Sequence, residues 1–146
     1  MTIVSISLSL GIPFLLLYSR KKGWNSHKFK QTLFFGMSII GLLGFILART
    51  NSLRFLFYAI LTTPVFLLVD YGFKYLSIKE HNRDFYLWLR FSDEIDDSFS
   101  GIGKNKHVKT IDIIFSISLL ILIAGMGVFG AVLFGQDALY NRLTNY

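Results

Sequence analysis

The sequence predicts an all-α integral membrane protein: a four-helix transmembrane bundle with one cytoplasmic loop that contains a short interfacial helix. The chain of 146 residues is 53% hydrophobic and only 16% charged, whereas soluble domains average about 25% charged residues. Its apolar residues gather in four runs, each near the length of about 20 residues that crosses a bilayer as a helix. We therefore treat residues 1–146 as a single transmembrane domain, with spans at about 2–18, 32–48, 53–78 and 110–135.

The first run is expected to be a retained membrane helix. A secretory signal carries positive charge before its apolar region, whereas here the basic sequence Arg20-Lys21-Lys22 follows it. Pro13 removes one backbone hydrogen bond, so it should kink the helix unless a neighbouring helix or a serine binds the freed carbonyl. Ser5 and Ser9 share a helical face, from which each can bond to another helix or to its own backbone.

Small residues mark two faces where helices can approach closely. In the second run, Gly44 and Ala48 have the spacing of a small-xxx-small pair. In the fourth run, Gly127, Ala131 and Gly135 repeat every four residues and form the longer stripe. We predict that both sets are helix-packing contacts.

Three charges fall inside the third and fourth runs, near their ends. Asp70 and Lys74 are four residues apart, so they share a face of the third helix and can pair. Their position near the far interface favours an ion pair with a snorkelling lysine over a transporter site. Asp112 lies in the first turn of the fourth helix, where the helix dipole favours a carboxylate.

The positive-inside rule predicts the orientation of the four spans. Eleven basic residues lie in the first and third connections, whereas Arg49, Arg54 and Arg142 lie on the opposite side. This predicts N-out and C-out, with loops 19–31 and 79–109 cytoplasmic, in a bacterial inner membrane or an organellar membrane. Anionic lipid accounts for the net charge of +6, so nucleic acid is not an expected partner. The eleven residues are Arg20, Lys21, Lys22, Lys28, Lys30, Lys79, Arg83, Arg90, Lys104, Lys106 and Lys109.

The loop 79–109 is the candidate functional segment. Its first half contains the dense block Phe85-Tyr86-Leu87-Trp88-Leu89, which we interpret as a short helix at the headgroup level. The alternative is an aromatic docking face for a partner protein. The candidate docking residues across the loop are Arg83, Asp84, Phe85, Tyr86, Trp88, Arg90, Asp93, Glu94, Asp96 and Asp97.

The second half of the loop carries an acidic cluster at residues 93–97. Four carboxylates in five positions can bind a hard cation, but Ile95 interrupts the EF-hand pattern and no glycine is sixth. An acidic turn that pairs with the following lysines explains the cluster better. Gly103-Lys104 is not a phosphate-binding loop, since Ser98 stands where that motif needs another glycine.

The residue inventory argues against catalysis and cofactors. Cysteine is absent, and His27, His81 and His107 all fall in predicted loops, so thiolate sites and membrane-embedded histidine pairs are excluded. We expect no metal, no cofactor and no enzymatic activity. The predicted function is a non-catalytic accessory or scaffold subunit of a larger membrane complex, with the lipid bilayer and other transmembrane proteins as partners.

Two alternatives stay open, and self-association is possible. One is a homo-oligomeric pore or channel, in which Ser5 and Ser9, Ser116, or an Asp70/Asp112 ring would line water. The other is a membrane-surface lipid-modifying enzyme that uses His81, Asp84 and the acidic cluster.

Overall fold

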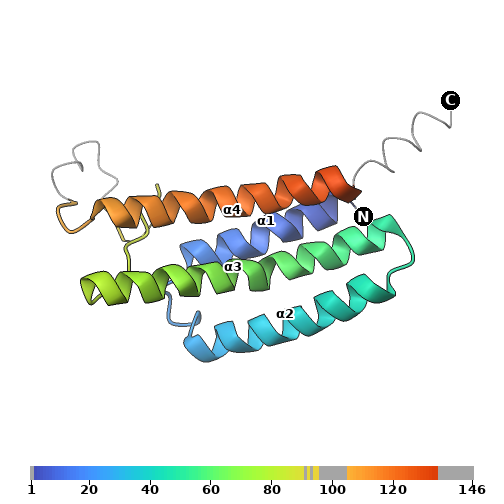
Figure 1. Cartoon of the computed structure of the whole chain (residues 1–146), viewed down its shortest axis with the longest axis horizontal. Coiled ribbons are helices and arrows are strands. Elements are labelled where there is room, and N and C mark those ends of the chain that lie inside the picture. The colour runs from blue at the N-terminus through green and yellow to red at the C-terminus, as the bar shows by residue number, and fades with distance from the viewer. Residues whose placement is uncertain (1, 91, 93, 96–104, 135–146) are drawn as a thin grey trace. The chain divides into compact units, whose positions relative to one another are not determined.

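The computed structural model describes residues 2–90, 92, 94, 95 and 105–134, and this part of the chain is helical without strands (Figure 1). Its helices are α1 (Thr2–Tyr18), α2 (His27–Leu47), α3 (Asn51–His81) and α4 (Thr110–Phe134). The last three are long and apolar enough to cross a membrane, whereas α1 is a shorter apolar helix of 17 residues. The all-helical class is thus confirmed, and the four-span topology stays a prediction.

Capping residues place the helix ends beyond the apolar runs. Ser26 caps α2, with its Oγ accepting the Phe29 N–H at 3.3 Å. At the other end of α3, Asn82 adopts a left-handed φ of 54° and its N–H bonds to Ile78 O at 2.9 Å, which closes the helix. The predicted loops 19–31 and 79–109 were therefore too long, because hydropathy marks only the part of a helix that lies in hydrocarbon.

The chain divides into two compact units, residues 1–67 with 122–146 and residues 68–121. The first, which we call the N-terminal unit, contains α1, α2, the first part of α3 and the last part of α4. The second, the loop unit, contains the rest of α3 and α4 with the connection between them. Each is described separately below.

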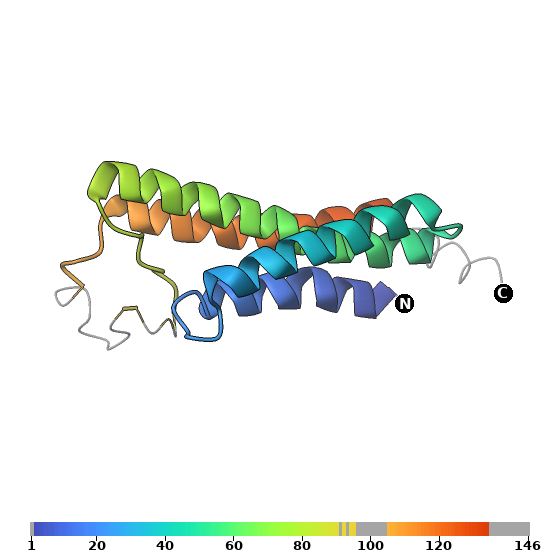
Figure 2. The ribbon, with the colours of Figure 1, turned by 90° about the horizontal axis from the view of Figure 1, so that it is seen from below.

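Glycines set the helix contacts of the N-terminal unit, where α2 returns beside the first part of α3 (Figure 2). A Cβ at Gly41 would lie 2.6 Å from Leu61 Cδ2, and one at Gly44 would overlap the Phe57 ring. Between α4 and its neighbours, Gly127 faces Leu10 in the same way. Close approach at these points lets main chains pack without intervening side chains.

The remaining predicted packing residues vary in their surroundings. Ala48 is buried at the end of α2, and Ala131 is half-buried on α4. Gly135 lies outside the described residues. Gly130, which the four-residue spacing omitted, faces both Phe55 and Tyr58 of α3, and the Tyr58 hydroxyl donates to Met126 O at 3.0 Å.

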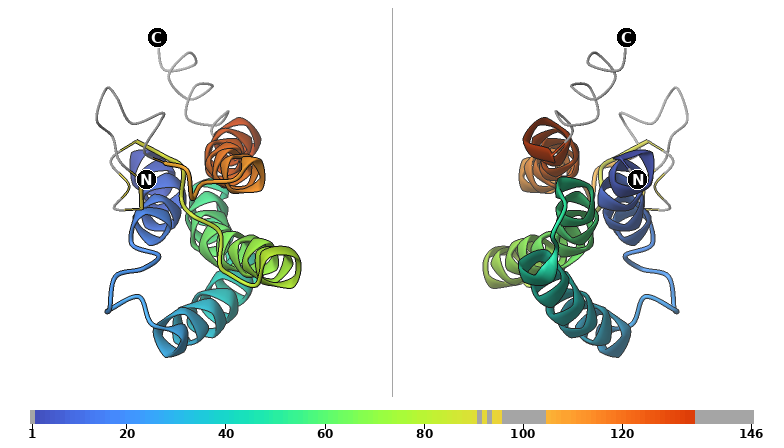
Figure 3. Two further views of the ribbon diagram at one scale, coloured as in Figure 1. Left: turned by 90° about the vertical axis from the view of Figure 1, so that its left-hand side faces the viewer. Right: turned by 90° about the vertical axis from the view of Figure 1, so that its right-hand side faces the viewer.

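The connection between α1 and α2 closes the end of α1 (Figure 3). The Asn25 amide donates to Ser19 O at 3.0 Å and to Leu16 O at 3.3 Å. These carbonyls belong to the last turn of α1, whose final C=O groups have no partner within the helix. One buried side chain therefore satisfies the helix end.

A threonine of α3 meets the carbonyl that Pro13 frees in α1. Proline has no N–H, so it leaves the carbonyl four residues earlier, that of Ser9, without its helical donor. Thr62 Oγ1 lies 3.3 Å from Ser9 O and 2.7 Å from Ala59 O, so its hydrogen is shared between the two helices. This contact is the neighbouring-helix donor that Pro13 required.

We expect Thr62→Val to lower the free energy of unfolding by about 1 kcal/mol, because it leaves Ser9 O without a donor inside the protein. The matched control is Thr63→Val. Both threonines are buried, but Thr63 Oγ1 has no hydrogen-bond partner, so its loss should be neutral or slightly stabilising. Thermal unfolding of the purified chain in detergent measures both, and equal effects would contradict the assigned role of Thr62.

Candidate functional site

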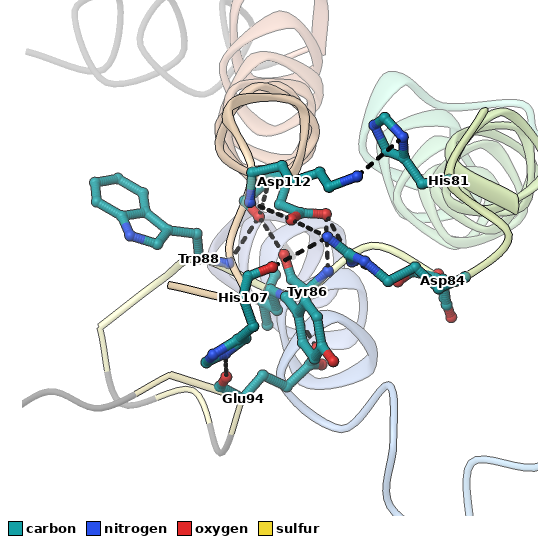
Figure 4. Close-up of polar contacts among 11 residues, drawn as sticks. His81, Asp84, Tyr86, Trp88, Glu94, His107 and Asp112 are labelled. Carbon is teal, nitrogen blue, oxygen red and sulfur yellow. Dashed lines mark hydrogen bonds and ion pairs between the residues drawn. The ribbon is translucent and has the colours of Figure 1, made fainter. Parts of the chain in front are cut away.

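The loop unit is organised around the carboxylate of Asp112, in the first turn of α4 (Figure 4). Its side chain is fully buried and forms a bidentate pair with Arg83: Nη2 to Oδ2 at 2.8 Å and Nη1 to Oδ1 at 3.2 Å. Two backbone amides complete the set, Lys109 N at 2.7 Å and Tyr86 N at 3.2 Å. The carboxylate therefore caps α4 and holds the connection that follows α3.

Arg83 links three parts of the loop unit. Besides Asp112, it donates to Asp84 O at 3.0 Å and to His107 O at 3.2 Å. Its guanidinium lies 4.5 Å from the centre of the Tyr86 ring, within cation–π range. Hydrogen bonding to Asp112 raises the pKa of Arg83, although partial burial opposes the shift, so the side chain stays cationic. We call Arg83, Tyr86, Asp112 and Ser116 the clamp.

Residues 84–88 are extended, so the predicted short helix at Phe85–Leu89 is wrong. Their N–H groups bond to side chains instead of to carbonyls four residues earlier. Tyr86 N donates to Asp112, Trp88 N donates to Ser116 Oγ at 2.8 Å, and Leu87 N donates to Glu94 Oε2 at 3.0 Å. Alternate amides thus bond to α4, the period-two pattern of an extended chain.

Side-chain burial follows the same alternation. Phe85 and Leu87 are buried, whereas Trp88 is 40% exposed. The Phe85 ring packs edge-on against Phe115 of α4 at 5.5 Å, and Phe115 stacks on Phe73 of α3 at 4.5 Å. The aromatic block is therefore a half-buried strand-like segment whose outer side chains are held in fixed positions.

Glu94 and His107 hold the two ends of the connection together. His107 Nε2 lies 3.3 Å from Glu94 O, and the His107 ring meets the Tyr86 ring edge-on at 4.7 Å. Glu94 accepts the Leu87 N–H, and its own N–H donates to Ser92 Oγ at 3.1 Å. The described part of this loop is therefore tied at both ends to the extended segment.

The structure distributes the other predicted site residues as follows. Lys74 Nζ lies 3.7 Å from Asp84 Oδ2 in a partly exposed pair, and Asp70 is buried at 4% exposure. Arg90 is exposed. Asp93, Asp96 and Asp97 lie outside the described residues, within which no group of three or more histidines or carboxylates is placed to hold a metal ion.

Ser116 is a functional position whose role the sequence did not reveal. Its hydroxyl accepts the Trp88 N–H and lies 2.7 Å from Asp112 O and 3.3 Å from Tyr86 O. The available signal was its spacing of four from Asp112, which places both side chains on one face of α4.

The polar residues considered for a pore are all buried within the chain. Ser5, Ser9, Asp70, Asp112 and Ser116 are each at most 4% exposed. A channel between copies of the chain is lined by outer surfaces. In this conformation these five side chains are not available to line one.

Comparison with known proteins finds no matching family model, and neither a curated protein nor a solved structure matches the chain. The fold and the clamp therefore define its class by themselves. The described chain is helical, with three helices able to cross a membrane, and its clustered polar groups fix an extended connection between two of them.

Proposed function

We propose that this chain is a small non-catalytic subunit of a larger membrane assembly, spanning the membrane four times with loop 82–109 on the cytoplasmic side. The observation that carries the proposal is the use of the clamp. The buried carboxylate of Asp112 accepts four hydrogen bonds from within the chain. Its electrostatic interactions are thus directed to positioning a segment, where a general base would need access to substrate.

The segment that the clamp positions has the character of a docking face. Trp88 is 40% exposed while its own amide is anchored on Ser116, and the indole points away from the cluster around Asp112 (Figure 4). Aromatic and arginine side chains dominate the binding energy of protein interfaces, and fixed positions reduce the entropy lost on binding. Tyr86 and Arg90 extend this face on either side of Trp88.

The helices supply a second kind of contact. The outer face of α2 exposes large apolar side chains, with Ile46 and Leu47 each 75% exposed. Lipid tails or partner helices suit such a surface, which water does not. At about 1.5 Å per residue, the 17 residues of α1 reach about 25 Å, enough for a thin bilayer or a small local deformation.

The test is gentle detergent extraction of the tagged chain from its native membrane, followed by native mass analysis. We expect heterologous membrane proteins at a fixed stoichiometry, and Trp88→Ala should reduce their recovery by about tenfold or more, as for a hot-spot aromatic. Trp24→Ala is the matched control, since Trp24 is 50% exposed in the N-terminal unit. A homo-oligomer alone, or equal losses in both variants, would contradict the proposal.

A further inference from the structure

Two basic side chains meet where α3 ends and α4 begins. Lys109 Nζ lies 3.4 Å from His81 Nδ1, at an exposed position. An ammonium group can only donate, so Nδ1 must be the acceptor and the ring hydrogen must be on Nε2. The pair therefore offers further Lys109 N–H groups and one His81 N–H side by side to a ligand.

The nearby carboxylates do not neutralise this pair in the structure. Asp112 is fully buried and bonded to Arg83, and Asp84 lies beside Lys74 at 3.7 Å. Glu80, the neighbour of His81 in α3, is exposed to solvent, and Lys79 adds a positive charge in the same last turn. The local charge is therefore positive, with hydrogen-bond donors directed outward.

We propose that His81 and Lys109 bind a phosphate group, and that an anionic lipid headgroup supplies it. An oxyanion that accepts from both Lys109 Nζ and His81 Nε2 forms charge-assisted hydrogen bonds with each. The pair lies where the apolar parts of two membrane-length helices end, which is the depth of the headgroups. This site is separate from the Trp88 docking face and does not depend on the proposed subunit role.

The experiment measures lipid binding to the purified full chain by native mass spectrometry, with phosphatidylglycerol and phosphatidylcholine as probes. We expect preferential binding of phosphatidylglycerol, which Lys109→Met and His81→Leu each weaken by about tenfold, the equivalent of one charge-assisted hydrogen bond. Lys106→Met removes the same charge from an exposed position nearby and should change the affinity by less than about twofold.

Equal weakening by Lys106→Met and Lys109→Met would overturn the site, because it would indicate a general charge effect. Absence of any headgroup preference would overturn it as well. A parallel titration with inorganic phosphate separates the two sources of the anion. If phosphate alone stabilises the wild type and Lys109→Met abolishes that effect while phosphatidylglycerol binds no better than phosphatidylcholine, the lipid assignment is wrong. Unchanged melting temperatures of the variants without ligand establish that they are folded.

Discussion

Replacing Arg83 with methionine is expected to release residues 82–90 from α4 and to lower the free energy of unfolding by about 2–3 kcal/mol. The variant leaves the Asp112 carboxylate, which is fully buried, without its counterion. Methionine keeps much of the side-chain length, so lost packing contributes little. Hydrogen exchange at the Tyr86 and Trp88 amides should accelerate on the order of 100-fold, since both are bonded only while the segment is held on α4.

Lys74→Met is the matched control for this prediction. It also removes one cation from an ion pair, but the Lys74 and Asp84 side chains are 49% and 30% exposed at a separation of 3.7 Å. Such a pair contributes about 0.5 kcal/mol or less, so the Tyr86 and Trp88 amides should stay protected. If Arg83→Met and Lys74→Met behave alike, the clamp does not hold the segment.

The double variant Arg83→Met with Asp112→Asn separates pairing from capping. Asparagine removes the buried charge but can still accept the Lys109 N–H that begins α4. The double variant should therefore be more stable than Arg83→Met alone, with a coupling energy of about 1 kcal/mol or more. Additive effects would show that Arg83 and Asp112 stabilise the loop unit independently.

The helical class could be predicted from the sequence because hydropathy and length are local properties. The runs around Ile39 and Ile121 could hardly form anything else in lipid, where each backbone polar group needs an internal partner. Helix ends were less predictable, because they depend on single caps such as Ser26 and Asn82. The apolar boundary and the capping residue lie several residues apart, so the predicted loops were too long.

The extended segment could not be predicted from its own residues. The block around Trp88 is apolar nearly throughout, so it carries neither a helical nor a strand period. Its conformation depends on acceptors on α4, and Ser116 lies 28 residues further along the chain than Trp88. Asp112 was placed correctly in a first helical turn, but its pairing with Arg83 is a tertiary contact that no local spacing indicates.

Gly44→Ala is expected to lower the free energy of unfolding by about 1–3 kcal/mol, which is the usual penalty for overpacking. A Cβ at this position would overlap the ring of Phe57, so α2 and α3 would have to separate or the ring would have to move. Gly36→Ala in the same helix is the matched control, because a Cβ there meets nothing within 4 Å. Alanine also favours a helix over glycine by about 1 kcal/mol, so the control should be neutral or stabilising.

Thermal unfolding in detergent measures this difference in sign, which no general effect of alanine on α2 can produce. Combining Gly44→Ala with Phe57→Ala tests the contact itself. If the ring is the obstacle, its removal makes room for the methyl group, and the double variant should lose less stability than the sum of the two single variants. Equal stabilities for Gly44→Ala and Gly36→Ala would mean that α2 does not pack on α3 at Gly44. The Gly41 contact with Leu61, one turn earlier in α2, would then have to hold the two helices together.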